Sequence, residues 1–184
     1  VPLGISGYYL YRAGQSLERQ ESIKAIKLLR RGRPFLRLTE QSYAAARPLL
    51  SFFFFTLVPE NLIQVEKNGY EFAETAMIAK DDARTLFTLL LKPQKSPEEI
   101  ATMSSHITKI NEEIETLYRT SGSIKDTLTF KFARAEKIQA RFTEIHSYLE
   151  TARVLMKHAD SLLAKDGTKN YIVFFYNNME IRPG

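Results

Sequence analysis

Residues 135–163 read AEKIQARFTEIHSYLETARVLMKHADSLL, and their apolar side chains recur at alternating steps of three and four. This spacing keeps the apolar residues on one face of a helix, and such a face needs a partner helix to cover it. The apolar ladder consists of Ala135, Ile138, Phe142, Ile145, Leu149, Ala152, Met156, Ala159 and Leu163. We therefore expect coiled-coil-like helix packing to organise the chain.

A second segment with the same pattern begins at Ser96, Pro97 and Glu99. Serine at the N-cap, proline at the first helical position and glutamate three residues after the cap form a capping box, which predicts a helix start here. The apolar residues that follow are again three or four apart, and they are Ile100, Met103, Ile107, Ile110, Ile114 and Leu117.

The second ladder stops at Ser121-Gly122-Ser123. Gly122 can adopt the left-handed conformation that ends helices, and Ser123 can cap the next one. The pattern therefore predicts helices near 97–121 and 123–165 that fold back on each other as an antiparallel hairpin. The alternative is one continuous helix through Gly122.

Three more amphipathic helices are expected upstream, near 16–31, 40–58 and 60–92. Gly32 and Pro34 predict the end of the first helix, because neither residue suits a helix interior. The other break signals in this region are Thr39 as an N-cap, Pro48 as a bend and Pro59 as a restart.

The predicted fold class is mainly α, an elongated antiparallel helical hairpin or bundle over residues 15–165. Residues 171–176 are aromatic and β-branched, which is typical of a strand. Because a lone strand is unstable in water, we expect one C-terminal β-strand of an incomplete α/β part. Residues 171–184 would then begin a further domain.

The composition is that of a folded chain with a modest basic excess. Apolar residues make up 44% of the 184 residues, and the net charge is +5. Such an excess favours phosphate-rich partners without choosing among them. The absence of cysteine excludes disulfides, thiolate metal sites and cysteine nucleophiles.

The first fourteen residues are apolar and aromatic and include Tyr8, Tyr9 and Tyr11 followed by Arg12. Tyrosines next to a basic residue suit the interface of a bilayer. Residues 1–14 are therefore expected to be the end of a membrane anchor or a juxtamembrane segment, although they are too short to span a membrane alone. The alternative is an ordinary frayed terminus.

No motif in the sequence indicates catalysis. The three histidines, His106, His146 and His158, lie on predicted helices, and none has the Glu three residues before it that a di-iron bundle uses. Glycine-rich phosphate loops, serine-hydrolase elbows and zinc-protease motifs are missing as well. We expect no catalytic, cofactor-binding or metal-ligating residues in this segment.

One basic stretch is a candidate contact for an anionic surface. It could be the solvated face of an amphipathic helix, or it could contact phosphate groups at a bilayer or wall surface. Nucleic acid is a weaker partner, because Phe35 is the only aromatic residue nearby. The candidate residues are Lys24, Lys27, Arg30, Arg31, Arg33 and Arg37.

The end of the chain, YIVFFYNNMEIRPG at 171–184, resembles the signature Tyr-Leu-x-x-x-x-Gln-Asn-x-x-Glu-Leu-Arg-Pro-x-Gly-Gly of a bacterial family called domain of unknown function 4012. Tyr176 stands where the family has glutamine. The alternative role for these residues is closing a strand-to-turn junction. The residues compared with the signature are Tyr171, Asn177, Asn178, Glu180, Arg182, Pro183 and Gly184.

The resemblance implies an envelope protein with an N-terminal membrane anchor, a helical region and a larger domain that starts at the signature. Our leading hypothesis is a membrane-anchored extracytoplasmic helical scaffold or stalk, non-catalytic in this segment. The alternatives are a helical sensor or ligand-binding ectodomain, or a structural subunit of a larger membrane-associated complex. Partners would be a membrane surface, and protein contacts or self-association through the helical seams and the C-terminal strand.

Overall fold

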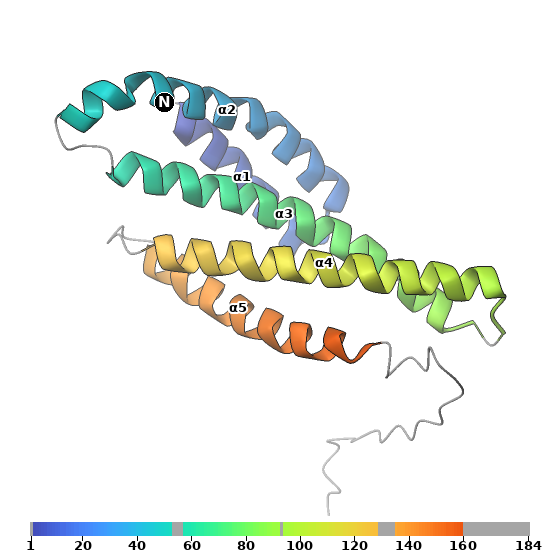
Figure 1. The fold of residues 1–184 in the computed structure, drawn as a ribbon. Coiled ribbons are helices and arrows are strands. Elements are labelled where there is room, and N and C mark those ends of the chain that lie inside the picture. Colours follow the sequence, from blue (N-terminus) through green and yellow to red (C-terminus); the bar gives the residue numbers. More distant parts are fainter. Residues whose placement is uncertain (1, 53–56, 93, 129–134, 160–184) are drawn as a thin grey trace, which may run out of the picture.

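The chain folds as a bundle of antiparallel helices. A computed structural model describes residues 2–52, 57–92, 94–128 and 135–159. Within these residues there are five helices and no strand, and consecutive helices run antiparallel (Figure 1). They are α1 (Pro2–Glu18), α2 (Ser22–Phe52), α3 (Leu57–Leu90), α4 (Pro97–Thr127) and α5 (Ala135–Lys157). The predicted helical bundle is confirmed for this part, whereas the strand predicted at 171–176 lies outside it.

The first helix ends in a tight turn that the sequence pattern did not indicate. Gln20 has a left-handed backbone with φ of 61°. Its N–H donates to Leu17 O at 2.9 Å and the Glu21 N–H donates to Ser16 O at 2.8 Å. These two bonds form a Schellman motif, which usually has glycine at the left-handed position. The prediction of a helix beginning at Ser16 was wrong because this break carries no glycine.

Helix α2 is continuous where two helices were predicted. It replaces the predicted helices 16–31 and 40–58 with a single one, and both Pro34 and Pro48 lie inside it. Thr39, predicted as an N-cap, lies in the helix interior, where its Oγ1 donates to Phe35 O at 2.9 Å. Such back-bonding satisfies the hydroxyl without ending the helix.

Gly32 is required by packing and does not end α2. A Cβ at Gly32 would overlap the Tyr70 hydroxyl oxygen and would lie 2.7 Å from Tyr9 Cβ. The missing side chain therefore lets α2 approach α1 and α3 closely. This close approach is a tertiary requirement, so the local sequence could not distinguish it from a helix stop.

The main core lies between α1, α2 and α3. Tyr70 is 1% exposed, and its hydroxyl donates to Ser6 O at 2.9 Å. Gly69 and Leu10 also bring α3 against α1, because a Cβ on the glycine would lie 2.7 Å from Leu10 Cδ2. The buried apolar residues of this cluster are Ala13, Ala25, Leu29, Leu36, Tyr70, Ala73 and Met77. Residues before Ser16 therefore belong to the bundle.

Helices α3 and α4 form a long hairpin that extends beyond α1 and α2 (Figure 1). At 1.5 Å per residue, α3 is roughly 50 Å long. The capping box predicted for α4 is confirmed: Glu99 N–H donates to Ser96 Oγ at 3.2 Å, and Ser96 N–H donates to Glu99 Oε2 at 2.9 Å. Phe87, Leu91 and Ile100 are exposed near the tip of this hairpin.

The turn predicted at Gly122 was wrong, because α4 remains helical through it, but the alternative of one continuous rod was wrong as well, because α4 ends at Thr127 and α5 packs back on it. Helix α4 runs on to Thr127, and a Cβ at Gly122 would lie 3.0 Å from His146 Cε1 on α5. Ser123, predicted as a cap, instead accepts a hydrogen bond from Asn68 Nδ2 on α3 at 2.6 Å. The three small residues therefore make room for two neighbouring helices.

Helix α5 packs antiparallel on α4, as the two ladders predicted, but it begins at Ala135 instead of near residue 123. Three polar residues spaced seven apart contact α4 beside the apolar ladder. Gln139 donates to Lys125 O at 3.3 Å, His146 Nδ1 lies 3.0 Å from Ser121 Oγ, and Arg153 Nε donates to Glu115 Oε1 at 2.7 Å. These contacts set the register of the hairpin.

Candidate functional site

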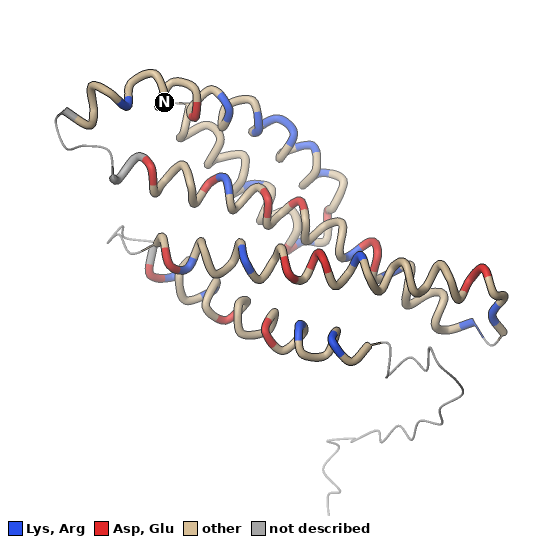
Figure 2. The backbone as a smooth tube through the Cα atoms, in the orientation of Figure 1, with Lys and Arg blue, Asp and Glu red and all other residues tan. Residues whose placement is uncertain are grey.

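The strongest concentration of charge in the described residues is on α2. This helix contains seven Lys or Arg residues and one acidic residue, Glu40. Its net charge is therefore +6, which exceeds the +5 of the whole chain and leaves −1 for everything else. Figure 2 shows the basic positions spaced along the helix. The basic excess of the protein is thus a property of one helix.

The six basic residues predicted from sequence are all exposed on α2. Two of them form ion pairs: Lys24 Nζ lies 3.0 Å from Glu21 Oε2, and Arg33 Nη2 lies 3.1 Å from Glu74 Oε2 on α3. The other four make no ion pair with any described residue, and they are Lys27, Arg30, Arg31 and Arg37. These four cations are free to meet an external anion.

Apolar side chains are interleaved with these cations. Ile23 is 73% exposed and Leu38 is 48% exposed, and both lie on the outward face of α2. Single exposed apolar side chains are common on protein surfaces, so the feature of note here is that these two lie among cations. The combination of exposed aliphatic and cationic side chains is typical of a surface that enters a lipid headgroup layer.

A basic pocket of about 660 Å³ lies at the N-terminal end of this face. Helix α3 contributes Lys80 and Arg84 to it, and α2 contributes Lys24 and Lys27. Lys80 Nζ donates to Ser22 Oγ at 3.0 Å, which ties α3 to the start of α2. The pocket also contains Glu21 and Asp81, so its positive charge is partly balanced.

A row of aromatic rings connects α1 to the basic helix. The rings of Tyr8 and Tyr9 meet edge to face with centroids 5.8 Å apart, and Tyr9 stacks on Phe35 of α2 at 6.1 Å. The guanidinium of Arg12 lies 5.9 Å from the Tyr8 ring centroid. Tyr8 is 55% exposed, so the row reaches from the interface between the helices to the surface.

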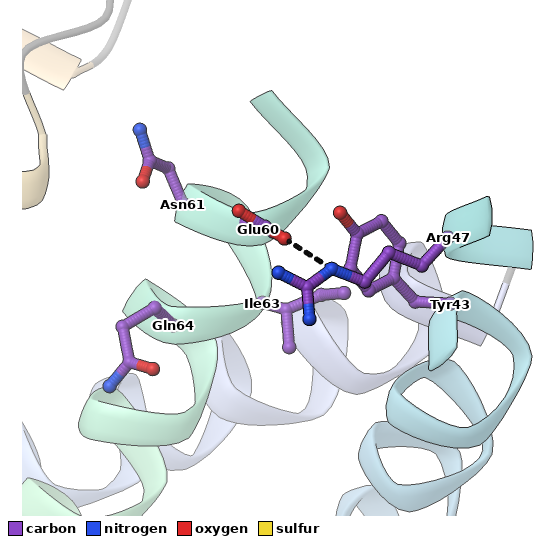
Figure 3. A pocket seen from close by; sticks show the side chains of 6 residues that line it. All are labelled: Tyr43, Arg47, Glu60, Asn61, Ile63 and Gln64. Atoms are coloured by element: carbon purple, nitrogen blue, oxygen red, sulfur yellow. Dashed lines mark ion pairs between the residues drawn. The ribbon is translucent and has the colours of Figure 1, made fainter. Parts of the chain in front are cut away.

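A second pocket lies where the end of α2 meets the start of α3 (Figure 3). Its volume is about 380 Å³, and most of its lining is polar. Arg47 Nε and Glu60 Oε1 form an ion pair of 3.2 Å across it. The lining residues are Tyr43, Arg47, Glu60, Asn61, Ile63 and Gln64.

A partly buried carboxyl group, that of Glu66, lies between α1 and α3. Ser6, which is fully buried, places its Oγ 2.5 Å from Glu66 Oε2 and 2.9 Å from Leu3 O. Burial raises the pKa of Glu66 to about 7, although the Ser6 hydrogen bond acts in the opposite direction. Gly7 is part of the same arrangement, since a Cβ there would lie 2.7 Å from Glu66 Oε1.

A second polar cluster joins α3 to α4. His106 Nδ1 lies 2.7 Å from Asp82 Oδ1, and both side chains are mostly buried. Burial, together with the nearby Asp82 carboxylate, raises the pKa of Glu113. Within the described residues, no group of three or more His, Cys, Asp or Glu is arranged to hold a metal ion. The His106–Asp82 contact links α4 to α3.

The remaining sequence candidates fall into two groups. His146 stacks on Tyr118 with centroids 4.1 Å apart, and His158 is exposed at the end of α5. The residues that carry the family resemblance, at 171–184, lie outside the described part of the chain. Across the described ranges, no helix has the length and apolar character needed to cross a bilayer.

Comparisons with known proteins find no family model, no curated protein and no solved structure that match the chain. The resemblance of residues 171–184 to domain of unknown function 4012 remains a prediction. Functional inference therefore depends on the residues themselves.

Sequence reasoning identified the basic stretch but not its surroundings. Lys80 and Arg84 were missed because they lie more than forty residues away from the basic stretch and reach the same pocket only through the pairing of α2 with α3. The exposure of Ile23 was not predicted from the sequence either. Its position next to Lys24 and Lys27 was the one local signal that could have placed it outside.

Proposed function

We propose that this chain is the membrane-proximal helical scaffold of a bacterial envelope protein, anchored to the membrane with the helical region extracytoplasmic. In this role it is a non-catalytic spacer. The surface of α1 and α2 lies on the membrane, and the α3–α4 hairpin, which packs on the other side of these helices, is held off the bilayer. In this scaffold the helices pack in a coiled-coil-like manner, and a C-terminal strand begins a further domain.

The observation that carries this proposal is the concentration of positive charge on one helix of the bundle, α2. Four cations of α2 make no ion pair with any described residue, and Phe87, Leu91 and Ile100 are exposed near the tip of the α3–α4 hairpin. A spacer needs two surfaces with different chemistry, because each surface meets a different partner. The basic face of α2 suits an anionic surface, and the apolar tip of the hairpin suits a protein contact.

The test is the location of the natural gene product, expressed from its own gene with all flanking residues. We expect it in the membrane fraction, resistant to extraction by high salt, and cleaved by protease added to intact spheroplasts. Recovery of the full-length protein in the soluble cytoplasmic fraction would overturn the proposal. Protection from external protease would contradict the extracytoplasmic orientation.

The alternative of a ligand-binding ectodomain would use one of the two pockets described above. Both pockets are open to solvent and have polar and charged residues in their lining, but the apolar parts of these side chains form much of the lining surface. No contact in either pocket favours a particular ligand. The scaffold proposal is therefore preferred.

A further inference from the structure

The surface shared by α1 and α2 is built around the stacked rings of Tyr9 and Phe35. Residues three and four positions from each ring lie on the same side of their helix. On α1 these neighbours include Ile5 and Arg12, and on α2 they include Arg31 and Leu38. All four are exposed. We call this surface, together with Tyr8 and Lys27, the docking face.

We propose that the docking face binds an anionic lipid bilayer, with its cations at the headgroup phosphates and its tyrosine and aliphatic side chains in the headgroup layer. This inference rests on the proposed function, because it states which surface of the scaffold lies on the membrane. The helices would then lie flat on the bilayer without crossing it.

Charge complementarity is the first argument for a bilayer. The α2 segment from Ser22 to Thr39 contains six basic residues and no acidic residue. Lys27 and Arg31 make no ion pair with described residues, so binding a phosphate would not require breaking an existing contact. An anionic surface gains roughly fivefold in affinity for each basic residue placed near it.

The apolar and aromatic groups favour a bilayer over a soluble polyanion. Nucleic acid or a charged wall polymer would use the cations but would leave Ile5, Leu38 and Ile23 in water. Tyrosine has an apolar ring and a polar hydroxyl, which suits the boundary between headgroups and acyl chains. The Tyr8 ring also lies beside Arg12, so one site offers both kinds of contact.

The test is flotation of the purified 184-residue protein with vesicles of phosphatidylcholine alone or with about one third phosphatidylglycerol. We expect binding only to the vesicles that contain phosphatidylglycerol. The double change Lys27→Gln with Arg31→Gln should weaken that binding roughly thirtyfold. The matched control, Lys137→Gln with Lys157→Gln on α5, removes the same charge from exposed positions and should change binding less than threefold.

A second pair of variants tests the apolar part of the proposal. Tyr8→Ser with Leu38→Ser keeps all charges and should weaken vesicle binding without changing the affinity for a single-stranded RNA oligonucleotide. All substituted side chains are substantially exposed, so circular dichroism should report unchanged folding. The proposal would be overturned if the α2 and α5 double variants weakened vesicle binding equally. It would also be overturned if Tyr8→Ser with Leu38→Ser bound vesicles as tightly as wild type.

The outcome separates this inference from the proposed function. If the natural protein is in the membrane fraction but the docking-face variants float like wild type, only the inference fails. If the natural protein is cytoplasmic, the proposed function fails whatever the vesicles show. RNA binding that is as tight as vesicle binding, and that depends on the same cations alone, would identify a nucleic-acid surface and contradict the bilayer.

Discussion

Replacing Gly32 with alanine is expected to destabilise the protein by about 2 kcal/mol, although alanine is the better helix former. A Cβ at this position would overlap the hydroxyl of Tyr70 and press on Tyr9. Tyr70 is 1% exposed and donates to Ser6 O, so its ring cannot move without disturbing the core. The cost of overpacking therefore exceeds the gain in helix propensity. Chemical denaturation followed by circular dichroism measures the change.

The control for this prediction is Gly14→Ala on α1. Nothing lies within 4 Å of a Cβ at Gly14, so only the helix propensity should act there. We expect this variant to be up to about 1 kcal/mol more stable than wild type. Opposite signs for the two substitutions would support the close packing of α1, α2 and α3. Stabilisation by Gly32→Ala would contradict it.

Lowering the pH from 8 to 5 is expected to reduce the amount by which Glu66 destabilises the folded protein. The pKa of Glu66 is about 7 in the folded protein, against 4.5 for an unperturbed glutamate. Between these values the folded state holds a proton that the unfolded state lacks, so stability increases as the pH falls. Above pH 7 both states are ionised, and the cost of burying the charge is fully present. The protonated carboxyl can donate to Ser6 Oγ, while Ser6 donates to Leu3 O.

Glu66→Gln copies the protonated form at every pH. We expect it to be on the order of 1–2 kcal/mol more stable than wild type at pH 8 and about equal at pH 5, a gain kept small because the group is only partly buried. Glu150→Gln, at an exposed position on α5, is the control and should leave the difference in stability between pH 8 and pH 5 as it is in wild type. Urea unfolding at the two pH values measures the difference. A Glu66→Gln variant that gains nothing at pH 8 would show that the carboxylate is well solvated.

The helices of the second half could be predicted because their signals are local. The Ser96 capping box and the alternating apolar ladders each involve residues within one or two helical turns, so they can be read from the sequence. The breaks at Gly32 and Gly122 could not be predicted correctly. In the local sequence, a glycine that ends a helix cannot be distinguished from one that makes room for a side chain of a neighbouring helix, as Gly32 does for Tyr70 and Gly122 for His146.

The candidate site was predictable only in part, for the same reason. The basic residues of α2 stand out in composition, but their pairing depends on α3: Arg33 meets Glu74, whereas Arg31 meets no described acidic residue. Contact between Tyr9 and Phe35 joins the tyrosines of the first segment to the basic stretch. Nothing in the spacing between these two segments predicts that contact, because it follows from the antiparallel turn at Gln20.

The central claim is that the exposed surface of α1 and α2 lies on the membrane, whereas the tip of the α3–α4 hairpin does not touch it. Because the chain contains no tryptophan, a single tryptophan can report each of these two places separately. Phe87 on α3 is 62% exposed near the tip, and Tyr8 lies on the docking face. The measurement is tryptophan fluorescence of Tyr8→Trp and Phe87→Trp with phosphatidylglycerol vesicles that contain brominated lipid. We predict a blue shift and quenching for Tyr8→Trp and no change for Phe87→Trp, whereas quenching at Phe87→Trp alone would contradict the claim.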